Sequence, residues 1–97
     1  MSKPKKVGIL LFNQVEVLDF AGPFEVFSIA TQRDMRTKLF SVQLVAEKME
    51  PITARNGLQV LPQTTTEAVG KLDILIVPGG DGADKIEIHN QRSLQWI

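Results

Sequence analysis

Two short, nearly continuous apolar runs constrain the fold of this 97-residue chain more than any other feature. The first run is KKVGILLF, residues 5–12, and the second lies within LDILIVPGG, residues 72–80. A strand with one solvated face alternates apolar and polar residues, whereas a strand buried on both faces is a continuous apolar run. The two runs therefore predict buried strands of a parallel sheet covered by helices.

The residues that follow the first run predict a helix and a second strand. Residues 13–19 indicate a loop, and AGPFEVFSIATQ, residues 21–32, indicates a helix. Pro23 suits the first turn of that helix, where a missing N–H group costs no hydrogen bond. Apolar residues then alternate with other residues over residues 37–48, a pattern that is typical of a strand.

The second half of the chain predicts a hairpin and two more helices. Residues 51–62 favour a hairpin that turns at Asn56–Gly57. Thr64 and Glu67 have capping-box spacing, so we expect a short helix from Thr64 to Gly70. A last helix is expected from Asn90, a suitable N-cap. Strands that alternate with helices in this order predict a doubly wound α/β fold.

The predicted elements are too few to cover both faces of such a sheet. The last helix also breaks off on the apolar segment LQWI. We therefore expect residues 1–97 to be the N-terminal portion of a single larger domain, with residues 1–5 as a disordered tail, and not to form a stable monomer alone. The alternative is a small self-sufficient domain, or a dimer that shares its layers.

Composition excludes several classes of function. Eleven basic and eleven acidic residues give a formal net charge of zero, so no basic field attracts nucleic acid to this segment. The absence of cysteine excludes disulfides and thiol nucleophiles within these residues and fits a reducing compartment. No apolar run approaches the roughly 18 residues of a membrane span. We expect a cytoplasmic protein without membrane attachment.

Two loops that follow the apolar runs contain candidate functional groups. Glu16 and Asp19 follow the first run, and the glycine turn Pro78–Gly82 follows the second. Ligands of open parallel sheets bind beyond the carboxyl ends of the strands, and parallel strands bring both loops to one edge. A carboxyl group would then face free backbone N–H groups, which can bind an anion or stabilise an oxyanion.

Each signal also has a purely structural explanation. Two glycines after a strand often only shape a turn. Asp19 precedes the predicted helix, where an acid stabilises the positive helix end by about 0.3–1 kcal/mol. Glu16, between two valines, is typical of a solvated loop residue. The chain contains no dinucleotide fingerprint, phosphate-binding Gly-Lys-Ser/Thr motif or set of metal ligands, so we expect neither cofactor nor metal.

Taken together, the motifs resemble the ThiJ/PfpI superfamily, and most closely its branch containing isonitrile hydratase and the amidotransferase-like domains of AraC-type regulators. LDFAGPFEVF resembles the signature of that branch around its acidic site residue, and VPGG is similar to its oxyanion turn. NQRSLQWI resembles the helix that precedes its nucleophile strand. The resemblance extends from about Lys6 to Ile97.

This resemblance implies the flavodoxin-like, three-layer sandwich of the class I glutamine amidotransferases, with a mainly parallel sheet. It also implies a nucleophilic cysteine beyond residue 97. Asp19 matches the acid that hydrogen-bonds the cysteine, and Gly80 matches the backbone donor near the sulfur, so both are expected to be catalytic. Gly79, Asp81 and Gly82 are expected to bind substrate. Without a cysteine, these residues form only half of such a site.

The resemblance leaves more than one function open. The first is a homodimeric hydratase or hydrolase-like enzyme that acts on a small molecule. The second is the ligand-sensing domain of an AraC-type regulator, which meets nucleic acid only through an additional C-terminal domain. A third is a protein whose cysteine is oxidised. A reading frame of about 190–230 residues would favour a stand-alone domain, and about a hundred residues more with a helix-turn-helix would favour the regulator.

Overall fold

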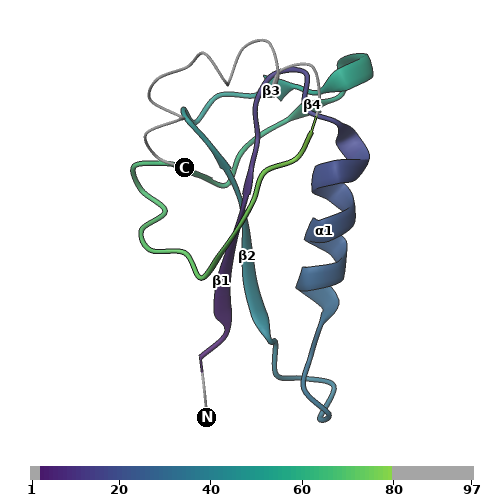
Figure 1. The fold of residues 1–97 in the computed structure, drawn as a ribbon, viewed down its shortest axis with the longest axis vertical. Helices are drawn as coiled ribbons and strands as arrows, with labels where there is room; N and C mark the ends of the chain where they lie inside the picture. Colours follow the sequence, from purple (N-terminus) through teal and green to yellow (C-terminus); the bar gives the residue numbers. More distant parts are fainter. Residues whose placement is uncertain (1–2, 80–97) are drawn as a thin grey trace.

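A computed structural model describes residues 3–79, and its centre is a four-stranded parallel sheet (Figure 1). The strands are, in spatial order, β5 (Thr64–Thr65), β2 (Phe40–Ala46), β1 (Lys5–Leu10) and β6 (Ile74–Ile76). In β1, Val7 lies opposite Val42 of β2 and Ile74 of β6. The predicted parallel strands over both apolar runs, and the α/β class, are confirmed.

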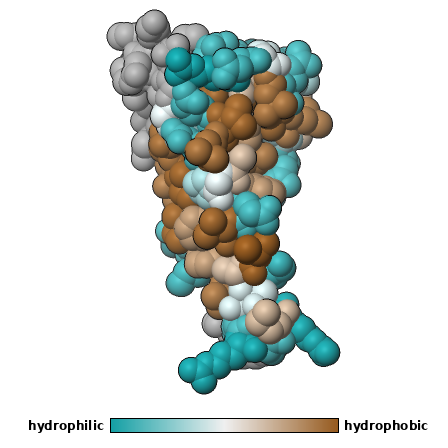
Figure 2. All heavy atoms as spheres, turned by 90° about the vertical axis from the view of Figure 1, so that its right-hand side faces the viewer, coloured by the Kyte–Doolittle hydropathy of each residue, from teal (hydrophilic) through white to brown (hydrophobic). Residues whose placement is uncertain are grey.

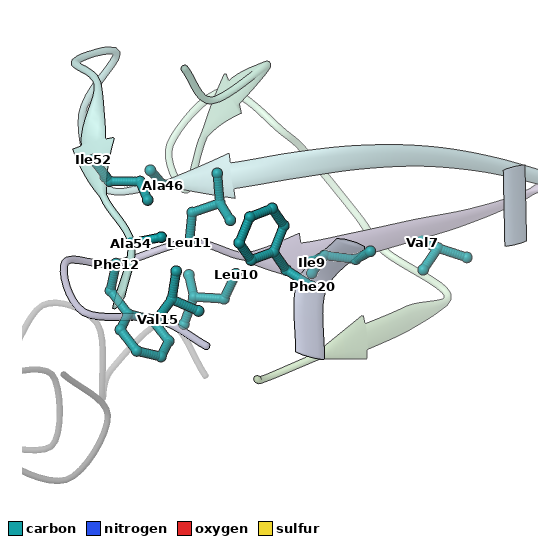
Figure 3. Close-up of a cluster of buried hydrophobic side chains, with 10 residues drawn as sticks. All are labelled: Val7, Ile9, Leu10, Leu11, Phe12, Val15, Phe20, Ala46, Ile52 and Ala54. Carbon is teal, nitrogen blue, oxygen red and sulfur yellow. The ribbon is translucent and has the colours of Figure 1, made fainter. Parts of the chain in front are cut away.

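β1 forms the centre of the hydrophobic core. Val7 and Ile9 are fully buried, and Leu10 is 2% exposed, so both faces of the strand are covered at its carboxyl end. Between them, Gly8 lies so close to Leu72 that a Cβ atom at residue 8 would be 2.6 Å from the leucine Cδ1. The core continues into the following loop, the helix, β2 and the hairpin (Figure 3); its members are Val7, Ile9, Leu10, Leu11, Phe12, Val15, Phe20, Ala46, Ile52 and Ala54.

The helix α1 spans Val17–Ile29, so it begins and ends before the predicted range of 21–32. The predicted loop over 13–19 is correspondingly too long. Pro23 lies inside the helix rather than in its first turn, so that prediction was wrong. Because proline has no N–H group, it cannot donate the usual backbone hydrogen bond to the carbonyl of Asp19, four residues earlier.

One side of α1 packs on the sheet, and the other is apolar and exposed. Phe20 is buried, and the ring of Phe27 meets that of Phe40 edge to face, with centroids 4.8 Å apart. On the outer side, Leu18, Val26 and Ile29 are 77%, 63% and 61% exposed. Figure 2, which views the molecule from the side where α1 lies in Figure 1, shows hydrophobic residues over much of this face.

The predicted hairpin is confirmed. Its strands β3 (Ile52–Thr53) and β4 (Gln59–Val60) are antiparallel, and the short 3-10 turn η1 (Arg55–Gly57) lies between them. Asn56 and Gly57 have φ angles of 67° and 93°, in the left-handed region that these two residue types tolerate best. The turn that the Asn-Gly pair predicts is therefore present.

The predicted short helix from Thr64 to Gly70 was wrong. Thr64 and Thr65 form β5, which lies parallel to the end of β2. Only a single turn follows, in which the N–H groups of Ala68 and Val69 donate to the Thr65 carbonyl at 3.1 and 2.9 Å. The Thr65 hydroxyl accepts a further bond from the Ala68 N–H at 3.2 Å. The open edge of β2 thus takes up residues that local capping signals assign to a helix.

Several predictions concern residues that the structure does not describe. They include the helix expected from Asn90 and residues 1–2 of the predicted 1–5 tail; Lys5, the last residue of that predicted tail, already belongs to β1. Within residues 3–79, no helix combines the length and the apolar character that crossing a membrane requires.

Candidate functional site

The predicted site lies where β1 and β6 end side by side. From β1 the chain builds the sheet outward through β2 and β5, and then returns to place β6 on the other side of β1. The sheet order therefore reverses between β1 and β6. In open parallel sheets, ligands bind outside the carboxyl ends of the strands at such a reversal. The residues that follow β1 and β6 therefore lie where a fold of this kind binds its ligands.

The structure brings Asp19 and Gly79 into contact at this edge. Asp19 lies in the first turn of α1, directly after the β1–α1 loop, and Gly79 lies three residues after the last residue of β6. A Cβ atom built on Gly79 would lie 3.3 Å from the Asp19 Oδ2 atom, which is tighter than most contacts of a real Cβ. The carboxylate therefore leaves little room for a side chain at residue 79.

A backbone hydrogen bond fixes this arrangement. The N–H group of Glu16 donates to the carbonyl of Gly79 at 3.0 Å. Glu16 is the N-cap residue of α1, so this bond ties the end of β6 to the start of the helix that contains Asp19. Pro78, which is buried, precedes the bonded glycine. The position of Gly79 relative to Asp19 is thus set by the backbone as well as by side chains.

Of the predicted site residues, the structure places two and brings them together, namely Asp19 and Gly79. Gly80, Asp81 and Gly82 lie outside the described residues, so the expected backbone donor and two of the expected substrate contacts stay predictions. The carboxyl group of Asp19 is exposed beside Gly79 at the carboxyl ends of the strands. A carboxyl group in this place can donate a proton to a bound ligand or accept a proton from it.

Sequence reasoning missed an ion pair beside this contact. Glu16 is not a freely solvated loop residue, because its carboxylate pairs with the guanidinium of Arg55 in the hairpin. The backbone N–H of Arg55 also donates to the carbonyl of Val15 at 3.0 Å. The two ion-paired residues are 39 positions apart, and no local pattern in the sequence links them.

A separate hollow of about 280 Å³ lies at the ends of β1 and β2, next to the hairpin. Neither Asp19 nor Gly79 lines it, and it does not lie at the reversal of the sheet order. We therefore centre the candidate site on the contact between Asp19 and Gly79. The hollow is lined by Leu11, Phe12, Asn13, Ala46, Glu47, Lys48, Glu50, Pro51 and Ile52.

Among residues 3–79, no group of three or more histidine, aspartate or glutamate side chains lies close enough together to hold a metal ion. The expectation of a site without metal or cofactor stays a prediction for the protein as a whole.

Comparison with known proteins places these observations in context. The DJ-1/PfpI family profile matches residues 5–96. The chain is 37% identical over 92 residues to isonitrile hydratase from Pseudomonas putida. The aligned part covers 95% of this chain but only 37% of that enzyme, so the chain spans little more than a third of this relative's length.

Solved structures agree with the fold. A ThiJ/PfpI family protein from Pseudomonas syringae matches with a TM-score of 0.81 and 23% identity, over 96% of this chain and 36% of that protein. An AraC family transcriptional regulator from Pseudomonas putida matches with a TM-score of 0.65 and 22% identity, over 79% of this chain and 48% of the regulator. At these identities the likeness establishes the fold alone.

Proposed function

This chain belongs to the DJ-1/PfpI family, and we propose that it is part of a small-molecule hydratase or hydrolase-like enzyme that acts through a cysteine outside residues 1–97. The observation that carries the proposal is the contact between the Asp19 carboxylate and Gly79 at the reversal of the sheet order. The 37% identity to isonitrile hydratase supports an isonitrile as the first substrate class to test.

The proposed chemistry gives each group one role. A cysteine thiolate attacks the terminal carbon of the isonitrile, and the protonated Asp19 carboxyl delivers a proton to that carbon. Water then adds across the C=N bond of the resulting thioimidate, and one of its protons goes to the nitrogen. As the thiolate leaves, the remaining hydroxyl proton returns to the Asp19 carboxylate, which yields an N-substituted formamide and regenerates the acid. In this proposal Asp19 is the general acid and the cysteine sulfur is the nucleophile.

The glycine turn supplies the second part of the proposed site. The backbone N–H of Gly80 would stabilise developing negative charge, as an oxyanion donor does, and such a donor is worth roughly 2.7–4 kcal/mol in the transition state. Gly79 keeps the space beside Asp19 free of a side chain. Asp81 and Gly82 are proposed to contact the substrate.

The alternative function is the ligand-sensing domain of an AraC-type regulator. The AraC family regulator among the structural neighbours is 22% identical, so it supports the fold and not this function. The closer sequence relationship to isonitrile hydratase favours the enzyme. We further propose a cytoplasmic homodimer, which the exposed apolar side of α1 supports.

The test uses the full-length protein and a simple alkyl isonitrile, with formamide formation followed by chromatography. We expect turnover, and we expect Asp19→Asn to lower kcat/KM by roughly 100-fold or more, since general acid catalysis contributes about 10²–10⁴-fold. Glu25→Gln, a substitution at the other acidic residue of α1, is the matched control and should retain activity. Absence of turnover, or equal loss in both variants, would reject the proposal.

A further inference from the structure

The β3–β4 hairpin is bound to the loop that precedes α1 by hydrogen bonds along the length of that loop. The Asn13 side chain accepts a bond from the Thr53 N–H at 3.0 Å, and the Gln14 N–H donates to the Thr53 carbonyl at 2.8 Å. The Arg55 N–H donates to the Val15 carbonyl. The hairpin thus contacts each of three successive loop residues through at least one hydrogen bond.

Arg55 extends this contact to Glu16, the residue whose backbone N–H is hydrogen-bonded to Gly79. Its guanidinium pairs with the carboxylate of Glu16, whose own N–H donates to the carbonyl of Gly79. Asp19 follows Glu16 by one turn of α1. A continuous set of contacts therefore runs from the hairpin, through Glu16, to both partners of the contact that we assign to the active site.

The ion pair between Arg55 and Glu16 is open to water. The Glu16 side chain makes no capping hydrogen bond with α1, although Glu16 is its N-cap residue. The side chains of Arg55 and Glu16 are 47% and 37% exposed, and ion pairs this accessible to water contribute little to folding stability. Its removal should leave the fold intact and change mainly the local geometry.

We infer that Arg55 is a positioning residue of the proposed active site, acting through Glu16 to fix Gly79 against Asp19. This inference rests on the proposed function. It assigns to the hairpin a part in catalysis that neither its sequence nor its distance from Asp19 along the chain indicates. Accurate positioning of groups around the reacting atoms is important for catalysis, because a misplacement of such a group by about 1 Å can lower the rate roughly 100-fold.

The sign of the change in the cysteine thiol pKa distinguishes a simple effect of charge from an effect of positioning. The readout is the pKa of the cysteine thiol in the full-length protein, measured by alkylation rate against pH. If Arg55 and Glu16 act only through their charges, Arg55→Ala raises the thiol pKa and Glu16→Ala lowers it. If they position the site together, both substitutions loosen the groups around the sulfur, and both raise its pKa.

The second readout is the stability of the hydrogen bond from the Glu16 N–H to the Gly79 carbonyl. Amide hydrogen exchange at Glu16, measured by NMR, reports how firmly its N–H is held by the Gly79 carbonyl. We expect exchange to accelerate roughly tenfold in both variants, and kcat to fall roughly 10-fold to 100-fold. The double variant should be no worse than either single variant, because both act through one contact.

Arg36→Ala and Arg55→Lys are the controls. Arg36 is an exposed arginine in the connection between α1 and β2, and its loss should leave the thiol pKa, the exchange rate and kcat unchanged. Arg55→Lys keeps the charge that pairs with Glu16 and should restore most of kcat. Thermal unfolding should show a Tm lowered by less than about 4 °C in all variants, as expected for an exposed ion pair.

The variant Asp19→Asn distinguishes failure of the positioning role of Arg55 from failure of the proposed function. If Asp19→Asn changes the thiol pKa while Arg55→Ala and Glu16→Ala do not, or shift it in opposite directions, the positioning role is wrong and the proposed function stands. If Asp19→Asn has no effect on the thiol, or the full-length protein has no reactive thiol, both are overturned. Parallel shifts in the two alanine variants, with faster exchange at Glu16, establish the positioning role.

Discussion

Replacing Gly79 with alanine should change stability and activity in opposite directions. The φ angle of Gly79 is not among the positive values, so alanine can adopt its backbone conformation. A glycine-to-alanine change at such a position stabilises a protein by about 0.4–1 kcal/mol, because it restricts the unfolded chain. The added methyl group would lie 3.3 Å from the Asp19 Oδ2 atom, and the exposed Asp19 side chain can move away at little cost.

The magnitude of the catalytic loss follows from that distance. Carbon atoms in ordinary contact with a neighbour lie about 3.5–4.0 Å away, so the carboxylate must move by a few tenths of an ångström. A displacement of 1 Å costs roughly 100-fold, which scales to roughly 3-fold to 10-fold for this smaller shift. That loss corresponds to about 0.7–1.4 kcal/mol of transition-state stabilisation.

The assay combines urea unfolding and isonitrile turnover on the full-length protein. Gly22→Ala is the matched control, since a Cβ atom at Gly22 in α1 meets nothing within 4 Å and should stabilise the helix without loss of rate. Full activity in Gly79→Ala, while Asp19→Asn is inactive, would show that the contact does not orient the acid. A loss of stability beyond about 1 kcal/mol would show that the Asp19 side chain cannot move aside.

Two further predictions concern residues away from the site. Gly8→Ala should destabilise the protein by about 1–3 kcal/mol in urea unfolding, because the new Cβ atom would lie 2.6 Å from Leu72; an unchanged midpoint would show that Leu72 repacks freely. Hydrogen bonds from the Thr37 hydroxyl, and then from the backbone N–H groups of Thr37 and Arg36, lower the pKa of Asp34 in the folded protein. The ionised Asp34 carboxylate therefore contributes to stability above its unfolded pKa, and this contribution is lost as the pH falls through the lower pKa of the folded state. Thr37→Val should raise the pKa of Asp34 in NMR titration, and an unchanged titration curve would contradict the assignment.

The strands could be predicted where a covered strand is a continuous run of apolar residues. β1 is a continuous apolar run because it lies inside the sheet with both faces covered, whereas β6 ends the described sheet and is half-buried. The hairpin was predictable because its Asn-Gly pair adopts positive φ angles. Both signals are local. The same reasoning located the edge at which Asp19 and Gly79 meet, since the carboxyl ends of parallel strands share one side of the sheet.

The errors arose where distant residues decide the local structure. α1 begins at Val17 without a side-chain cap, so no capping residue marks its start, and Pro23 suggested a later one. Thr64 and Thr65 pair with the edge of β2, a partner that their own capping signals do not reveal. The pairing of Glu16 with Arg55 depends on how the hairpin folds back on the loop, which no short pattern encodes.

The buried core and the proposed site occupy different parts of this chain, and this separation allows the site to be probed by substitution. The buried contacts centre on Val7 and Ile9 of β1, whereas Asp19 and Gly79 are exposed at the end of the sheet. Substitutions that remove buried apolar groups typically cost 2–5 kcal/mol and risk unfolding. Exposed polar substitutions usually stay within about 0.5 kcal/mol, so a large loss of rate at Asp19 would report on chemistry rather than on folding.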